Sequence, residues 1–183
     1  CISRLINNRE VTCFQNPEMG REGNWGKGTL VPVNKPQEIS VIGGGPAGLR
    51  FAGTAALRGH SVTLFESESD LGGRINILKK LPTRATWQRA IDNLVTRAEI
   101  AGVKIHTSSK IVESTMQGDI SVFATGALWE TKGYSPYRPE RAAIPGHKFP
   151  LVTDIKTAVE LALSSSEALG KNVIIVDETG EYL

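Results

Sequence analysis

Three glycines and one glutamate form the most informative pattern in this sequence of 183 residues. The glycines are Gly43, Gly45 and Gly48, and Glu66 follows 18 residues after the last of them. In a strand–turn–helix, the first glycine makes a tight turn, the second lets the backbone approach a pyrophosphate, and the third lets helix and strand pack closely. The N–H groups that begin the helix favour the negative charge of a phosphate. A carboxylate at Glu66 can accept hydrogen bonds from both hydroxyls of a ribose, so the pattern predicts a dinucleotide or ADP site.

The neighbouring residues supply the elements that such a site needs. A β-branched run at 39–42 predicts a strand, helical spacing continues over 49–57 and ends near Gly59, and 62–65 predicts a second strand directly before Glu66. A structural turn with a surface glutamate is the alternative. Because strand, helix, second strand and acid all stand in register, nucleotide binding is the preferred interpretation. The carboxylate would repel the 2′-phosphate of NADP.

The rest of the chain continues the alternation of strands and helices. We expect a helix, two strands, a second helix and a buried closing strand at 83–101, 103–105, 120–124, 154–168 and 173–176. This order predicts an α/β fold, a Rossmann-like FAD/NAD(P)-binding three-layer domain with a parallel sheet. Residues 1–36 are rich in Asn, Gly and Pro without a sustained period, and predict an irregular tail.

Composition limits the possible partners. Hydrophobic residues make up 40% and charged residues 22%, and 21 Lys+Arg against 19 Asp+Glu give a net charge of +2. Nothing in this balance favours nucleic acid or a membrane as a partner. No apolar run reaches the ~18 residues of a membrane span, and no signal peptide is visible; we therefore expect a cytoplasmic protein. The chain starts at Cys1 and stops just after an apolar run, so we expect a piece of a longer polypeptide.

Two further segments resemble the FAD-binding domains of the pyridine nucleotide–disulfide reductase superfamily. They are the Gly-Gly motif at 70–74 and the Ala-Thr-Gly motif at 119–126. In that superfamily both motifs lie close to the nucleotide. For Arg74, a solvated surface charge is the alternative. The cofactor-binding residues predicted from the three motifs are Gly43, Gly45, Pro46, Ala47, Gly48, Glu66, Ser67, Gly73, Arg74, Ala124, Thr125 and Gly126.

The two cysteines, Cys1 and Cys13, have eleven residues between them. By themselves they indicate inert thiols, because a disulfide is not expected in a reducing compartment. Two thiolates also cannot supply the four ligands that an iron–sulfur cluster takes.

The residues around the cysteines, at 1–4 and 12–17, resemble one family when they are taken with the glycine motif and with 124–129. It is the iron–sulfur flavoenzyme family of trimethylamine dehydrogenase, histamine dehydrogenase and 2,4-dienoyl-CoA reductase, which are NADH:flavin oxidoreductases of the old yellow enzyme type. The resemblance covers essentially the whole chain, and the trimethylamine dehydrogenase branch is nearest. In this family four cysteines hold a 4Fe–4S cluster; Cys1 and Cys13 match the third and fourth ligands, and the first two would lie upstream.

The resemblance implies a division of the chain and a set of cofactors. It implies a remnant of the iron–sulfur segment at 1–36, the first half of an FAD/ADP-binding domain at 37–150, and a linker helix with the first strand of an inserted NAD-like domain at 151–183. FAD or ADP would bind here, whereas FMN and the 4Fe–4S cluster belong to the parent protein only. The implied partner is the parent's own (β/α)8 FMN barrel, and the parent is expected to be a homo-oligomer.

The implied function is that of a fragment of a multi-cofactor, electron-transferring oxidoreductase. The parent would be an amine dehydrogenase/demethylase or an enoate/dienoyl reductase. The isolated fragment is expected to be inactive, because we identify no catalytic residue in it. Two alternatives stay open: a non-catalytic nucleotide-binding structural or interaction module, and a stand-alone FAD reductase, which would need a second FAD half.

Overall fold

The computed structural model describes residues 2–13, 15–26, 28–112, 118–129, 131–133, 138–165 and 167–176. Its elements in chain order are α1 (Ile2–Ile6), α2 (Glu22–Trp25), β1 (Glu38–Ile42), α3 (Pro46–Leu57), β2 (Ser61–Phe65), α4 (Ile75–Leu78), the 3-10 turn η1 (Ala85–Trp87), α5 (Gln88–Ile100), β3 (Lys104–His106), β4 (Ile120–Phe123) and α6 (Ile155–Ser164). The chain divides into two compact units. One comprises Cys1–Asn76 and Thr86–Gly126, and the other comprises Ile77–Ala85 and Ala127–Leu183.

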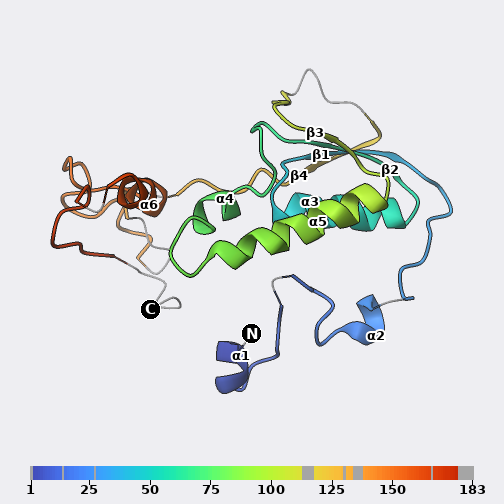
Figure 1. The fold of residues 1–183 in the computed structure, drawn as a ribbon, viewed down its shortest axis with the longest axis horizontal. Helices are drawn as coiled ribbons and strands as arrows, with labels where there is room; N and C mark the ends of the chain where they lie inside the picture. Colours follow the sequence, from blue (N-terminus) through green and yellow to red (C-terminus); the bar gives the residue numbers. More distant parts are fainter. Residues whose placement is uncertain are drawn as a thin grey trace. The chain divides into compact units, whose positions relative to one another are not determined.

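The first unit is built on a parallel sheet with the strand order β3-β2-β1-β4 (Figure 1). Val41 at the centre of β1 pairs with Leu64 of β2 on one side and with Val122 of β4 on the other. The chain runs outward from β1 to β2 and β3 and then returns to the other side of β1. The strand order therefore reverses at β1, the point where open α/β sheets form a crevice at the carboxyl ends of their strands. The predicted parallel Rossmann-like fold is confirmed.

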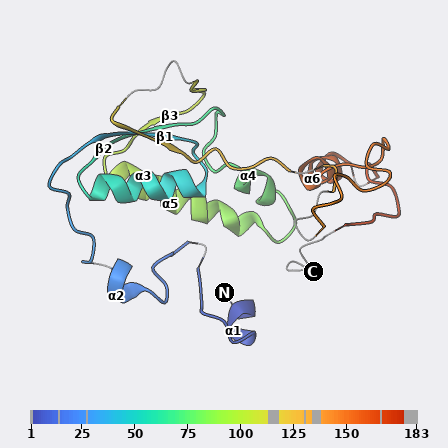
Figure 2. The ribbon, with the colours of Figure 1, turned by 180° about the vertical axis from the view of Figure 1, so that it is seen from behind.

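Helices α3 and α5 lie on the same face of this sheet (Figures 1 and 2). The largest fully buried side chains are Val41, Leu64 and, on α3, Leu49. A Cβ at Gly53 of α3 would lie 3.5 Å from the Cα of Ala98 on α5, so small residues let the two helices approach closely. This packing fixes the beginning of α3 at the carboxyl end of β1, where the glycine motif lies.

Three expected elements differ from the structure. The helix expected over 83–101 begins at Gln88, after the 3-10 turn η1, because Thr83 has a φ of +66° that a helix does not accommodate. The helix expected over 154–168 ends at Ser164, and it begins beside Asp154, whose Oδ1 accepts hydrogen bonds from the N–H groups of Lys156 and Thr157 at 2.8 and 3.1 Å. The prediction of a buried strand at 173–176 was wrong. These residues form no strand and are exposed, and Ile174 has 90% of its surface exposed. A β-branched run is stable as a strand only when a neighbour pairs with its backbone, and no described strand pairs with this one.

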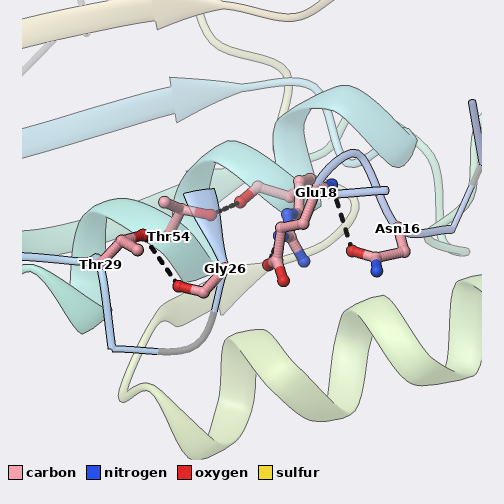
Figure 3. A network of polar contacts seen from close by, with 6 residues as sticks. Asn16, Glu18, Gly26, Thr29 and Thr54 are labelled. Carbon is pink, nitrogen blue, oxygen red and sulfur yellow. Dashed lines mark hydrogen bonds and ion pairs between the residues drawn. The ribbon is translucent and has the colours of Figure 1, made fainter. Parts of the chain in front are cut away.

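The first 36 residues are irregular between the short helices α1 and α2, as their composition predicts. The segment is tied to α3 by an ion pair of 2.7 Å between Glu18 and Arg50. Figure 3 shows its local hydrogen bonds beside α3: Asn16 accepts from the N–H of Glu18, and Thr29 donates to the carbonyl of Gly26. The ion pair therefore holds this largely irregular part of the first unit beside α3.

Across the residues that the structure describes, no helix combines the length and the apolar character needed to cross a membrane.

Candidate nucleotide-binding site

The glycine motif begins with a turn that packs directly against the chain leaving β4. Gly43 has a φ of +111°, a conformation that strains other residues. A Cβ there would collide with the carbonyl oxygen of Ala124 and would lie 3.1 Å from the N atom of Thr125. A Cβ at Gly48 would collide with the carbonyl oxygen of Gly43. The first and third glycines therefore serve close packing, and they bring the Ala-Thr-Gly segment against the glycine turn.

Gly45 differs from these two glycines because, among the described residues, no atom fills the space into which a Cβ would point. Its φ of −74° suits any residue, and a Cβ would meet nothing within 4 Å. Gly45 is the N-cap residue of α3, Pro46 occupies the first turn, and no side chain caps this helix among the described residues. A helix that begins without a cap leaves N–H donors available for an anion. The space beside Gly45 is open where a pyrophosphate would approach.

Glu66 lies at the end of β2 and is only 8% exposed. Its Oε2 accepts a hydrogen bond of 2.7 Å from the N–H of Gly44, and its Oε1 accepts from the N–H of Glu68 at 3.0 Å and from the hydroxyl of Ser67 at 3.1 Å. A buried carboxylate needs such donors to offset its lost hydration. Three of its roughly four acceptor positions are used, so one is left on Oε2 for a ligand hydroxyl. The rotatable hydroxyl of Ser67 can release a second.

The Gly-Gly loop packs against the glycine turn from the other side. The N–H of Gly72 donates to the carbonyl oxygen of Gly44 at 2.9 Å. A Cβ at Gly73 would lie 3.4 Å from the Cα of Gly45, so these backbones approach closely. The side chain of Asn76 donates to the carbonyl oxygen of Leu71 at 3.0 Å and closes the loop.

The structure brings most of the predicted cofactor-binding residues to one edge of the sheet. Gly43, Gly45 and Gly48 lie at the end of β1, Glu66 and Ser67 at the end of β2, and Ala124 at the end of β4. Gly73 joins them through its approach to Gly45. The remaining predicted residues, Ala47, Arg74, Thr125 and Gly126, are exposed, and Pro46 is half-buried in the first turn of α3.

Some residues that shape this edge were not among those predicted to bind the cofactor, although Gly44, Leu71 and Gly72 lie inside the glycine and Gly-Gly motifs. Gly44 makes two of the hydrogen bonds that fix the glycine turn, one to Glu66 and one from Gly72. Leu71 packs against Gly44, because a Cβ at Gly44 would lie 2.5 Å from Leu71 Cδ2. Gly72, rather than Gly73, makes the backbone bond between the loops. Asn76 carried no signal in the sequence, because its role depends on a contact with the carbonyl oxygen of Leu71.

The two cysteines expected as metal ligands are not both among the described residues. Cys13 is a half-buried free thiol, and Cys1 lies outside the described residues. Throughout the described part of the chain, no group of three or more His, Cys, Asp or Glu side chains is placed to hold a metal ion. We therefore assign no chemical step to a cluster here.

Comparison with known proteins agrees with the fold and with the position of the motifs. A family model described as an NAD(P)-binding Rossmann-like domain matches residues 41–85. A metal reductase of Desulforamulus reducens is 32% identical over 96% of this chain, which covers 25% of that protein. The solved 6-hydroxypseudooxynicotine amine oxidase of Pseudomonas geniculata N1 is 31% identical with a TM-score of 0.72, over 82% of this chain and 23% of that one. Histamine dehydrogenase of Rhizobium sp. 4-9 is 26% identical with a TM-score of 0.69, over 78% of this chain and 21% of that one.

Fold and site together define a Rossmann-like nucleotide-binding domain. More narrowly, the chain is homologous to one region of a group of oxidoreductases that includes histamine dehydrogenase. The resemblance inferred from its motifs is confirmed. The chain spans about a quarter of the length of these relatives.

Proposed function

We propose that this chain is the adenine-dinucleotide-binding region, holding FAD or ADP, of a multi-cofactor oxidoreductase. The parent would act as an amine dehydrogenase or demethylase, or as an enoate or dienoyl reductase, with FMN and a 4Fe–4S cluster outside the region described here. Homology to an amine oxidase and to histamine dehydrogenase supports the amine branch. The parent's barrel, its oligomeric state and the inactivity of the isolated chain are parts of the same proposal.

The open space beside Gly45 is the observation that carries this proposal. Gly43 and Gly48 are needed for packing inside the protein. Gly45 is not, because a Cβ at this position would meet no protein atom within 4 Å and its φ is ordinary. A glycine that the fold itself does not require, at the start of an uncapped helix, is explained by a ligand that approaches its backbone.

Each part of the site has a role in holding the nucleotide. The first N–H groups of α3 would bind the pyrophosphate, aided by the helix dipole. Glu66 would accept hydrogen bonds from the ribose hydroxyls, and its negative charge would disfavour a 2′-phosphate. When FAD is bound, its flavin supplies reversible electron acceptance. The residues of this chain contribute binding and orientation.

Adding a single methyl group at position 45 tests whether a pyrophosphate approaches the backbone of Gly45. Gly45→Ala should fold with the melting temperature of the wild type, because the added Cβ meets no protein atom. It should weaken ADP binding at least about tenfold in calorimetry, or roughly 1.4 kcal/mol, because the methyl occupies the space of the pyrophosphate.

Gly53→Ala is the matched control in the same helix, since its Cβ would make only ordinary contact, at 3.5 Å, with Ala98. This variant should bind ADP as the wild type does. Equal ADP affinity of Gly45→Ala and the wild type, or no ADP binding by the wild type, would contradict the proposal.

The affinities for ADP and FAD distinguish a site that recognises only the ADP part of the ligand from one that also recognises the flavin ring. The residues that we assign meet the ADP part of the ligand, so FAD and ADP should bind with similar affinity. FAD binding a hundredfold tighter than ADP would show that the chain also recognises the flavin ring. The alternative of a non-catalytic nucleotide-binding module predicts ADP binding by this chain and no flavin in the full-length parent.

A further inference from the structure

The glycine turn contains three consecutive glycines, which would leave its peptide planes free to rotate unless other groups hold them. Gly44 makes the hydrogen bonds that hold the two peptide planes on either side of it. Its N–H donates to Oε2 of Glu66 at 2.7 Å, and this bond orients the peptide between Gly43 and Gly44. Its carbonyl oxygen accepts from the N–H of Gly72 at 2.9 Å, and this bond orients the peptide between Gly44 and Gly45. The second peptide matters most for a pyrophosphate, because it carries the N–H of Gly45 at the start of α3.

The partner of that second peptide is itself held by a side chain. The N–H of Gly72 and the carbonyl of Leu71 belong to one planar peptide unit. Asn76 donates from Nδ2 to this carbonyl oxygen at 3.0 Å. The planar unit is thus fixed at both ends, by Asn76 on one side and by Gly44 on the other. A continuous path of hydrogen bonds runs from the carboxamide of Asn76 through two peptide planes to the N–H of Gly45.

The Oδ1 atom of the Asn76 carboxamide indicates that packing alone does not explain an asparagine at this position. Oδ1 of Asn76 is buried, and no group in the described part of the chain forms a hydrogen bond with it. A Cβ on Gly72 would lie 2.9 Å from this oxygen, so the carboxamide stands directly over the Gly-Gly loop. Burying an unpaired acceptor carries a cost that an apolar side chain of similar shape would avoid. The donor function of Nδ2 offsets that cost.

From this path we infer that Asn76 is a positioning residue of the nucleotide site: through the Leu71–Gly72 peptide, it orients the Gly44–Gly45 peptide toward the pyrophosphate. The inference rests on the proposed function. Glu66 orients the neighbouring peptide and also meets the ribose, whereas Asn76 acts without touching the ligand. Hydrogen bonds in such a chain polarise one another, so the carboxamide also strengthens the N–H of Gly45 as a donor. A turn that is already oriented loses less freedom when the ligand binds.

The test compares ADP with adenosine, which lacks the phosphates. In Asn76→Ala and Asn76→Leu, ADP should bind about tenfold more weakly, and adenosine should bind within twofold of the wild type, as measured by NMR titration of the 183-residue chain. The melting temperature of unliganded Asn76→Leu should stay close to that of the wild type, because the substitution removes the buried unpaired Oδ1 together with the hydrogen bond to Leu71. Asn93→Ala is the matched control: its exposed carboxamide on α5 contacts Gln15 at 3.3 Å, and ADP affinity should not change.

A purely structural role would weaken ADP and adenosine together and lower the melting temperature, and that result would overturn the inference. Unchanged ADP affinity in both Asn76 variants would overturn it while leaving the proposed function intact. A wild type that does not bind ADP would overturn both.

If the Asn76 variants do not fold, NMR titration of the wild type with ADP and with adenosine still tests the inference. ADP, but not adenosine, should shift the Asn76 side-chain NH2 resonances and the amide resonance of Gly72. If these stay fixed while the amide of Gly45 shifts, the inference is wrong.

Discussion

At the scale of single residues, Glu66 has two roles that are usually considered separately. Its Oε2 accepts a hydrogen bond from the N–H of Gly44 at 2.7 Å, and the same oxygen has a second acceptor position that could take a ribose hydroxyl. The carboxylate therefore helps to build the glycine turn and, under the proposed function, would also recognise the nucleotide. The role of a ribose acceptor follows from the sequence pattern, whereas the structural role follows only from the contact with Gly44.

Both roles predict that Glu66 is required for adenosine as well as ADP. Glu66→Ala should weaken each of them by about 10- to 150-fold, the equivalent of ~1.5–3 kcal/mol for a hydrogen bond to a charged group. Glu66→Gln should rescue little, because its NH2 would face one of the donors at Gly44, Ser67 or Glu68.

Calorimetry on folded variants, checked by circular dichroism, measures the effect of each Glu66 substitution. Glu68→Gln removes a neighbouring exposed charge as the control and should leave both affinities unchanged. Equal losses in Glu68→Gln and Glu66→Gln would indicate a general charge effect instead of a contact.

At the scale of elements, the sequence predicted a helix or strand correctly where the contacts that stabilise it lie within one segment of the chain. The strand–turn–helix at 39–57 was predicted because its glycines and its apolar spacing carry the signal within one segment. The strand at 173–176 was wrong because pairing is a long-range property that a β-branched run does not reveal. The resemblance implied that the Ala-Thr-Gly and Gly-Gly motifs both lie close to the nucleotide. It did not specify the contact of Gly43 with Ala124 or the hydrogen bond from Gly72 to Gly44, which depend on how the three loops pack.

Helix α6 shows how one local contact defines the beginning of an element and makes it depend on pH. The N–H and hydroxyl of Thr157, together with the N–H of Lys156, donate to Asp154 and hold the pKa of this carboxyl below its usual range. A lowered pKa in the folded state means that the cap stabilises α6 fully above the unfolded pKa of about 4. This stabilisation is lost as the pH falls through the lower folded-state pKa.

We expect α6 to fray as the pH is lowered below about 4, whereas Asp154→Asn should keep a weaker cap that does not respond to pH in this range. Asp154→Ala should destabilise the helix by ~1 kcal/mol at neutral pH. Amide exchange of Ala158 to Ser164, followed by NMR, measures both effects. A helix that frays equally in wild type and Asp154→Asn would show that another group causes the pH dependence.

At the scale of the whole molecule, burial is distributed unequally between the two compact units. Every residue that is buried among those described belongs to the first unit, where Val41, Leu64 and Leu49 form the centre of the core. The described part of the second unit contains α6 but no buried residue. Hydrophobic burial is the main source of resistance to unfolding, so the two units should differ in the free energy needed to expose their amides.

Nucleotide binding should widen this difference. A ligand that binds only the folded first unit, present at a hundred times its Kd, adds ~2.7 kcal/mol to the free energy of unfolding. The amides of Val41 and Leu64 should therefore exchange about a hundredfold more slowly with saturating ADP, because they exchange only when the core opens. Amides of α6 should exchange at the same rate with and without ADP, since helix fraying exposes them without opening that core. In Gly45→Ala at the same ADP concentration, the slowing at Val41 and Leu64 should be reduced by about tenfold, in proportion to its weaker binding. If ADP slows amide exchange in α6 as much as in β1, the chain unfolds as one cooperative body. If amide exchange slows in neither element, ADP does not bind the first unit.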